Sequence, residues 1–298
     1  MHRRHGDIWA SRDGAPVTSL ASGGGRDFDP LTVPVRPAAT VMLVRDRESD
    51  GALEVFMMRR TLQAVFAGGM YVFPGGRLDE VDAGAEMEAI CDGLSDAEAS
   101  ALLQIDAGGL AYWVAAIREC FEEAGVLLAR SAETGEYVRF DGSDDAARFT
   151  ADRERVHDGS LGMIELCARE GLRLATDRMF YTAHWITPAG EARRFDTRFF
   201  VARAPQAQEP LHDDGETIAS AWLTPAEALA GERSGEYVML PPTIESLRFL
   251  AQSAIADEAL VAASRIGVPP MILPKLRGNP ADGNLDVVMP DDPEYDSL

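Results

Sequence analysis

The sequence predicts an α/β (α+β) fold in which a mixed β-sheet is sandwiched between helices. Short apolar runs typical of strands occur both before and after a long central block with helical periodicity. The chain has 298 residues, of which 46% are hydrophobic, so it can bury a substantial core in one large domain or two smaller ones. No internal repeat is apparent. No apolar run approaches the roughly 20 residues that span a bilayer, so no membrane segment is expected.

Two strands and a tight turn are predicted first. Residues 38–44 and 53–58 are apolar runs, and Asp50-Gly51 between them favours a hairpin turn. Residues 68–76 then predict a third short strand, which ends in a Pro-Gly-Gly turn.

The central block is predicted to be mainly helical. Residues 83–109 indicate one or two helices, with Asp96 near a helix start and Gly108-Gly109 at the end. The pattern over residues 110–129 is strongly helical, and residues 144–171 predict further helix with breaks.

Strands return in the second half of the chain. Residues 178–185, 194–202 and 219–223 are strand-like. Thr224-Pro225 then predicts a helix start, with threonine as N-cap and proline at the first helical position. Residues 243–255 predict a last amphipathic helix, and a Pro- and Asp-rich tail follows.

Domain boundaries follow from these changes in composition. Residues 1–34, rich in Gly, Asp, Ser and Arg, are interpreted as a flexible arm or as an arm that packs on another subunit of a homodimer. Residues 35–257 are expected to form the main domain, residues 83–111 a helical excursion from it, and residues 258–298 a C-terminal extension.

The net charge of −21 argues against binding to nucleic acid or to anionic membranes. An enzyme with this charge that acts on phosphates would need a divalent cation and local arginines. The three cysteines, Cys91, Cys120 and Cys167, form no CxxC pair, and no apolar segment follows the basic start. We therefore expect free thiols, no signal peptide and a cytoplasmic setting.

Three carboxylates are predicted to cluster on the helix at 110–129. At about 100° per residue, Trp113, Ile117 and Cys120 share an apolar face, whereas Glu119, Glu122 and Glu123 lie elsewhere at i, i+3 and i+4. Like charges at this spacing destabilise a helix, and a cation such as Mg²⁺ would remove that penalty. Arg118 lies four residues before Glu122 and can pair with it, and Gly125 can end the helix. The alternative reading of such a run is a solvated charged face.

The surroundings of this helix resemble the Nudix hydrolase superfamily. Residues 118–126 read RECFEEAGV, which is similar to the second half of the Nudix box, R-E-U-x-E-E-x-G-U with U apolar. Its first half, a glycine followed six positions later by an acid, is matched by Gly76 and Asp82, although Asp replaces the usual Glu. The halves are separated by 35 residues instead of the usual seven, so about 28 residues are inserted. Lengthening a surface loop is inexpensive, so such an insertion is tolerable.

An interrupted box of this kind is known in the Nudix branch that includes the peroxisomal coenzyme A and acyl-CoA diphosphatases. Further runs in this chain are similar to that branch: VFPGGRLD at 72–79, HWITP at 184–188, RRFDTRFF at 193–200 and WLTP at 222–225. The resemblance implies a Nudix fold with residues 83–111 as a helical insertion inside the box.

The resemblance also implies a chemistry and a set of site residues. Glu119, Glu122 and Glu123 would bind Mg²⁺ or Mn²⁺, and water would attack one phosphorus of a small-molecule diphosphate, with coenzyme A or acyl-CoA as a candidate substrate. Glu122, Arg118 and Glu216 are the expected catalytic residues; Asp213 and Asp214 are neighbouring candidates for the role of Glu216. Arginine clusters suit phosphate recognition as well as surface ion pairs, and substrate binding is assigned to Arg60, Gly75, Gly76 and Arg194.

Two alternatives remain open at this point. The substrate could be a nucleoside or sugar diphosphate, or the chain could be a binding or regulatory module with a Nudix fold and no turnover. The presence of all three glutamates and Arg118 favours an enzyme. The histidines show no zinc-site spacing, and His184 beside Trp185 is interpreted as a packed strand residue.

Overall fold

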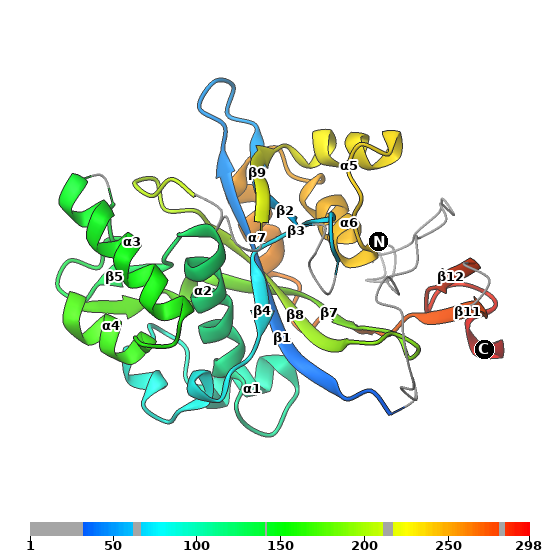
Figure 1. Ribbon diagram of the computed structural model, residues 1–298, viewed down its shortest axis with the longest axis horizontal. Coiled ribbons are helices and arrows are strands. Elements are labelled where there is room, and N and C mark those ends of the chain that lie inside the picture. The colour runs from blue at the N-terminus through cyan, green and yellow to red at the C-terminus, as the bar shows by residue number, and fades with distance from the viewer. Residues whose placement is uncertain (1–31, 62–66, 141, 211–216, 280–283) are drawn as a thin grey trace.

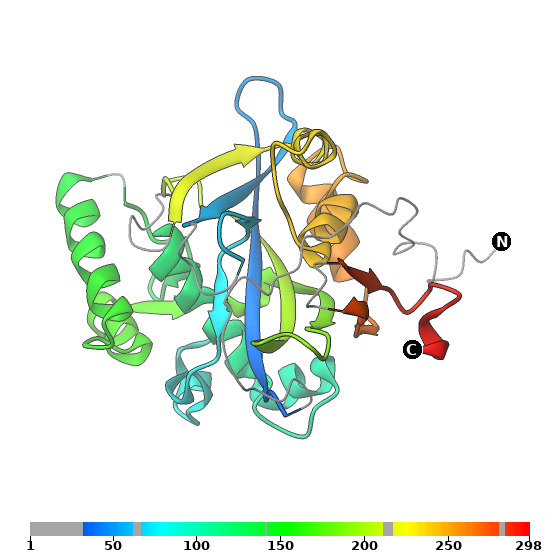
Figure 2. The same cartoon turned by 45° about the vertical axis from the view of Figure 1, so that its right-hand side comes forward.

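The structure of the protein is a computed structural model, which describes residues 32–61, 67–140, 142–210, 217–279 and 284–298. A mixed sheet runs through the middle of the molecule, with α2, α3 and α4 on one side and α5, α6 and α7 on the other (Figures 1 and 2). The predicted fold class is therefore confirmed. Among the described residues, no helix is both long and apolar enough to cross a membrane.

The sheet is built around β1 (Val35–Asp46), which pairs with three other strands. It runs antiparallel to β2 (Leu53–Arg60) and to β4 (Gly75–Arg77), and parallel to β8 (Arg194–Arg203). The predicted first hairpin is confirmed, and Gly51 adopts φ +74° in its turn, a conformation that favours glycine.

The rest of the sheet extends outward from these strands. β7 (Met179–Ile186) pairs with β8, and β10 (Met271–Ile272) pairs with β7 in parallel. On the other side, β3 (Tyr71–Val72) and β9 (Thr217–Leu223) both pair with β2. The parallel and antiparallel pairs together make the sheet mixed, as the sequence predicted.

The single strand predicted at 68–76 is two short strands in the structure. β3 pairs with β2 and β4 pairs with β1, because the chain crosses from one neighbour to the other at Phe73-Pro74. The Pro74 carbonyl accepts a hydrogen bond from the Val41 amide at 2.9 Å, which holds the crossing against β1.

The insertion lies outside the central sheet, as expected. It contains a 3₁₀ turn (Met87–Ile90) and α1 (Asp96–Leu103), and its Cys91 forms one bridge to the peripheral β6 (Leu172–Leu174). Leu103 is buried, whereas Leu102, one position earlier on α1, is 37% exposed. The N-cap of α1 is Ser95, which accepts the Glu98 amide.

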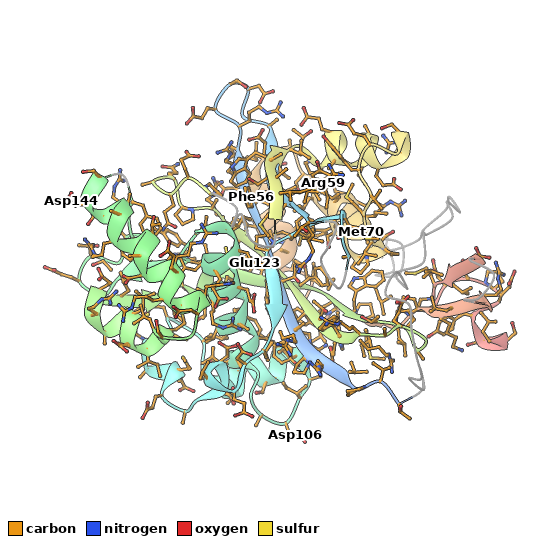
Figure 3. The ribbon with its side chains drawn as sticks, in the orientation of Figure 1. Phe56, Arg59, Met70, Asp106, Glu123 and Asp144 are labelled. Atoms are coloured by element: carbon orange, nitrogen blue, oxygen red, sulfur yellow. The ribbon has the colours of Figure 1, made fainter. Side chains whose placement is uncertain are left out.

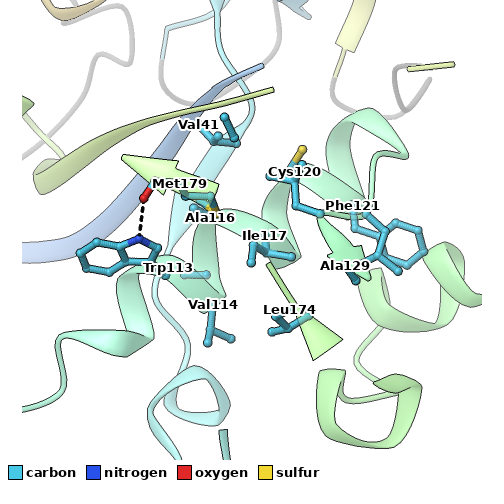
Figure 4. Close-up of a cluster of buried hydrophobic side chains, with 14 of the residues drawn as sticks. Val41, Trp113, Val114, Ala116, Ile117, Cys120, Phe121, Ala129, Leu174 and Met179 are labelled. Atoms are coloured by element: carbon cyan, nitrogen blue, oxygen red, sulfur yellow. Dashed lines mark hydrogen bonds between the residues drawn. The ribbon is translucent and has the colours of Figure 1, made fainter. Parts of the chain in front are cut away.

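Helix α2 (Leu110–Ala124) is the central helix of the fold. Trp113 and Ile117 pack into the core, as predicted, and the Trp113 indole donates to the Met179 carbonyl at 3.2 Å (Figure 4). The helix ends at Ala124 with Gly125 as its C-cap, as the glycine indicated, so the helical pattern that continues to residue 129 overstates its length. Residues 126–129 instead lead into β5 (Ala129–Ser131), which pairs with β6.

The helices after α2 cover the two faces of the sheet. The predicted broken helix is α3 (Ser143–His157) followed by α4 (Met163–Glu170), on the α2 side. The helix predicted from Thr224-Pro225 is α5 (Pro225–Ser234), with Thr224 as N-cap and proline in the first turn. The last predicted helix is α6 (Pro241–Leu250), and the unpredicted α7 (Ala256–Ser264) follows it.

Two hydrophobic clusters fill the space on the two sides of the sheet. One contains most of α2 together with the inward residues of α3 and α4, and the other contains residues of α6 and α7. Beyond them, β11 (Lys275–Asn279) and β12 (Asn284–Val288) form a separate hairpin, followed by a 3₁₀ turn (Tyr295–Ser297).

Candidate functional site

Arg118 on α2 joins two segments that the insertion separates in sequence. Its guanidinium donates two hydrogen bonds of 2.9 Å to the carboxylate of Asp82 and a third of 2.9 Å to the carbonyl of Arg77. Asp82 is 1% exposed and Arg118 is 6% exposed, so the pair is shielded from water. The shorter aspartate at position 82 therefore still reaches the arginine, and the two halves of the interrupted motif meet in space.

The three glutamates of α2 lie close to this arginine and to strand β4. The Arg118 Nη1 atom donates to Glu119 at 2.9 Å and to Glu122 at 3.0 Å, which confirms the predicted pairing of Arg118 with Glu122. Glu123 accepts a 2.8 Å hydrogen bond from the backbone amide of Gly75. In Figure 3 Glu123 lies in the middle of the molecule, whereas Asp106 and Asp144 lie at its periphery.

These glutamates do not form a solvated helix face. Their side chains are only 14%, 12% and 13% exposed for Glu119, Glu122 and Glu123 respectively. Most of α2 is buried on every side, because the sheet, the insertion and α3 all pack against it. A buried carboxylate needs a cation or hydrogen-bond donors to compensate for the loss of water. Clusters of buried acidic side chains are more typical of functional sites than of an ordinary protein surface.

Gly75 and Gly76 allow the strand to approach α2 and β1 closely. A β-carbon at Gly76 would lie 2.4 Å from the carboxylate carbon of Glu119, and one at Gly75 would lie 2.4 Å from the Ala39 carbonyl oxygen. Both distances are far below van der Waals contact. The Gly-Gly pair is therefore required by space, and the gap at Gly76 is filled by the carboxylate itself.

The electrostatics of the cluster reflect burial combined with crowding of like charges. Burial and then the charge of Glu123 raise the pKa of Glu119 to about 8, although Arg118 acts in the opposite direction. Burial also raises the pKa of Glu122, again against the effect of Arg118. Burial alone would lower the pKa of Arg118, but its hydrogen bond to Asp82 and the charges of the glutamates raise it above the ordinary value.

The insertion holds the N-terminal end of α2. The carboxylate of Asp96 accepts the backbone amides of Gly108 and Leu110, each at 3.0 Å, and Ser100 accepts the amide of Gly109 at 2.9 Å. Asp96, expected near the start of the insertion's own helix, thus accepts the first amide of the next helix and one amide just before it, and its charge offsets the positive end of that helix. A β-carbon at Gly109 would meet the Ser100 nitrogen at 2.2 Å, so these helices touch through backbone.

The remaining site candidates are placed differently. An Nη1 atom of Arg60 lies 3.7 Å from the Glu123 carboxylate, beside the cluster. Arg194 lies at the start of β8, where its Nε donates to the Thr187 carbonyl at 3.0 Å. Glu216, like Asp213 and Asp214, lies outside the described residues. His184 is a packed residue of β7, as interpreted, and its Nε2 is 2.7 Å from Asp196.

Two residues near the glutamates were not identified from the sequence. Arg153 of α3 donates to the backbone carbonyls of Glu122 and Glu123, and the His157 Nδ1 atom lies 3.7 Å from the Glu122 carboxylate. Both are on α3, some 30 residues further along the chain, and only the packing of α3 against α2 brings them here. Their spacing of i, i+4 on one helix was the sole local signal, and by itself it indicates only a shared face.

A family model and several known proteins are similar to this chain. A family model described as the NUDT19 Nudix domain matches residues 95–250, a little over half of the chain. The chain is 26% identical over 234 residues to the acyl-coenzyme A diphosphatase NUDT19 of Xenopus laevis, covering 69% of this chain and 61% of that protein. With the human protein of the same name it is 27% identical over 250 residues, covering 74% of this chain and 66% of that protein. The chain thus spans slightly less than two thirds of the length of these relatives.

A solved structure supports the same assignment. The crystal structure of a NUDIX hydrolase from Alicyclobacillus acidocaldarius is similar to this chain with a TM-score of 0.60 and 27% sequence identity. The similarity covers 77% of this chain and 97% of that one, so nearly all of the smaller protein has a counterpart here. On the family model, these relatives and the joined motif around Arg118, the chain belongs to the NUDT19-type Nudix domain family within the Nudix hydrolases.

Proposed function

We propose that this protein is a metal-dependent diphosphatase that uses Glu119, Glu122 and Glu123. The observation that carries the proposal is the Arg118–Asp82 pair, which closes the interrupted motif and brings the three carboxylates against Gly75 and the adjacent glycine. Three nearly buried carboxylates are stable side by side only if a cation or a proton neutralises part of their negative charge.

The donor set fits a hard divalent cation such as Mg²⁺ or Mn²⁺. All three groups are carboxylates, the ligands that these ions prefer, and burial together with the charge of Glu123 raises the pKa of Glu119. The Glu119 carboxylate occupies the space beside Gly76 that a β-carbon would fill, so this glycine admits the carboxylate to the cluster. When bound, the cation would neutralise the diphosphate and the charge that develops on the leaving group.

The residues of the chain supply the remaining requirements. Arg118 orients Glu119 and Glu122 while its own charge is balanced by Asp82. The Gly75 amide fixes the carboxylate of Glu123, and Arg60 beside it presents a guanidinium that suits a phosphate oxygen. We assign to Glu216 the role of general base or of a further metal ligand, as the family resemblance implies.

The proposed substrate is coenzyme A or an acyl-CoA. The support is the printed name of the Xenopus and human relatives, acyl-coenzyme A diphosphatase, and the interrupted motif shared with that branch. Cleavage of the diphosphate would yield 3′,5′-ADP and a 4′-phosphopantetheine compound. A nucleoside or sugar diphosphate is the alternative substrate for the same chemistry.

A non-catalytic binding module is the second candidate function, and one observation favours it. Arg118 already engages Glu119 and Glu122, and within the described part of the chain no three acidic, histidine or cysteine side chains converge as a metal site in their present orientations. Turnover would require the two carboxylates to release this arginine in part.

A substrate panel separates these functions. Purified protein is incubated with coenzyme A, an acyl-CoA, ADP-ribose and a dinucleotide diphosphate, with Mg²⁺, with Mn²⁺ and with EDTA, and products are identified by mass. We expect cation-dependent cleavage with coenzyme A or acyl-CoA as the best substrate. Binding of a diphosphate without cleavage under every condition would favour the module.

Replacement of one ligand tests the assigned carboxylates. Glu123→Gln keeps the shape and can still accept the Gly75 amide, so the thermal midpoint should stay unchanged or rise. Turnover should fall at least about 10²-fold, as expected when stabilisation of transition-state charge is lost. The matched control is Glu98→Gln on α1, where glutamine preserves the capping box with Ser95. If Glu123→Gln kept full cation-dependent turnover, the assignment of Glu123 as a metal ligand would be wrong.

We also propose the setting of the enzyme. Its three cysteines are free and buried, in keeping with a reducing cytoplasm. A homodimer, an N-terminal arm over 1–34, a Nudix domain over 35–257 and a C-terminal extension over 258–298 remain the proposed organisation. Sedimentation and limited proteolysis would test these assignments directly.

A further inference from the structure

The C-terminal end of α2 is held by one side chain from α3. The Nε atom of Arg153 donates to the Glu122 carbonyl at 2.8 Å, and its Nη2 atom donates to the Glu123 carbonyl at 2.9 Å. These two nitrogens form one edge of the planar guanidinium, so the two bonds are made in a single fork.

The contact with Arg153 satisfies backbone carbonyls at the end of α2. The last four carbonyls of a helix lack partners within the helix, and here they belong to residues 121–124. The amide of Gly125 satisfies the Phe121 carbonyl at 3.0 Å. Arg153 satisfies the next two, which are the carbonyls of Glu122 and Glu123. Its positive charge also opposes the negative end of the helix dipole.

Helix α3 is anchored firmly enough to serve this role. Phe149 and Val156 are 3% and 5% exposed and belong to the same hydrophobic cluster as α2. Phe149 also stacks on Phe140, with ring centroids 4.4 Å apart. Arg153 lies between these anchors along α3, so its reach to α2 is fixed by the packing of the core.

We propose that Arg153 is a positioning residue that holds the last turn of α2, and through it the carboxylates of Glu122 and Glu123, in place for a divalent cation. This inference rests on the proposed function, because it assigns the two glutamates as ligands. Without the two hydrogen bonds from Arg153, the last turn of α2 can fray, and the carboxylates of Glu122 and Glu123 then move with the backbone of that turn. An outer group that orients ligands in this way typically changes metal affinity or activity by about 10- to 100-fold when it is removed.

The test compares Arg153→Gln, Arg153→Lys and wild type by three measurements. Calorimetric titration with Mn²⁺ in the absence of substrate should show affinity at least about tenfold weaker for Arg153→Gln. Hydrogen exchange should be faster at the Gly125 amide, which reports the helix end directly. The KM for Mn²⁺ activation should rise together with a fall in kcat. Lysine keeps the charge but cannot span both carbonyls in one plane, so Arg153→Lys should recover the fold and only part of the affinity.

Arg155→Gln is the matched control, because Arg155 lies on the same helix, is 42% exposed and faces Asp152 at 3.6 Å. It should leave all three measurements unchanged. Mn²⁺ affinity of Arg153→Gln within about twofold of wild type, in a protein that cleaves a diphosphate, would overturn the positioning role. Complete recovery by Arg153→Lys would overturn the role of the fork. If exchange at the Gly125 amide were faster in Arg153→Gln but the wild type cleaved no diphosphate, the proposed function would be wrong. Arg153 would then stabilise the end of α2 without positioning metal ligands.

Discussion

The joint between the two halves of the interrupted motif can be tested by removing one charge. Asp82→Asn keeps the size of the side chain but replaces one acceptor oxygen by an NH₂ group. That group would face the guanidinium of Arg118, which has only donors to offer. The substitution therefore breaks a bidentate pair and leaves a buried cation with less compensation.

The magnitude follows from burial. The Asp82 side chain is fully buried and that of Arg118 is 7% exposed, and breaking such a pair typically costs about 3–5 kcal/mol. Because Arg118 keeps its bonds to Glu119 and Glu122, we expect the lower end, about 3 kcal/mol. At about 2 °C per kcal/mol for a chain of this size, the midpoint should fall by about 6 °C.

Urea unfolding monitored by tryptophan fluorescence measures the change, since the buried Trp113 lies on the same helix as Arg118. The control is Asp79→Asn in the same loop: Asp79 lies 3.6 Å from Arg118 but is 56% exposed, so its pairing is worth less than about 1 kcal/mol. If both variants lost the same small amount, the Arg118–Asp82 pair would not be what joins the motif.

Three further outcomes follow from the same geometry. Gly76→Ala should displace the Glu119 carboxylate and lower turnover by at least about tenfold with little change in unfolding free energy, whereas a loss of stability alone would contradict the assignment. Asp96→Ala should cost about 1–2 kcal/mol, measured by urea unfolding, because two amides at the start of α2 lose their acceptor. Burial raises the pKa of Cys91 and of Cys167 to about 12, so both should resist iodoacetamide at pH 8 until the protein unfolds. Since unfolded thiols ionise first, urea unfolding should also show stability falling as the pH rises from about 9 toward 12, and rapid labelling in the native state would refute the burial.

The insertion acts as more than a lengthened loop. Its Asp96 and Ser100 hold the N-terminal end of α2, while Arg153 of α3 holds the other end. An acid at the positive end and a base at the negative end both stabilise the helix dipole. The helix that carries the glutamates is therefore supported at both ends by segments outside the motif itself.

Local sequence patterns determined the elements of the fold and the helix of the site. The alternation and turn residues of the first hairpin, the Thr224-Pro225 helix start and the end of α2 at Gly125 are decided by neighbours within a few residues, so the sequence alone predicts them. The spacing of Glu119, Glu122 and Glu123 is fixed by the helical repeat for the same reason.

Tertiary packing alone decided what surrounds these carboxylates. No local pattern indicates that Asp82 would pair with Arg118 across an interval of 35 residues. Nor does one indicate that the Gly75 amide would donate to Glu123, or that Arg153 of α3 would donate to the carbonyls at the end of α2. Each of these contacts joins segments whose approach depends on how whole helices and strands pack, and that packing depends on side-chain volumes summed over the entire core. The same cause rules out the alternative reading of the three glutamates as a solvated charged face, because the sheet, the insertion and α3 cover the flank of α2 that carries them.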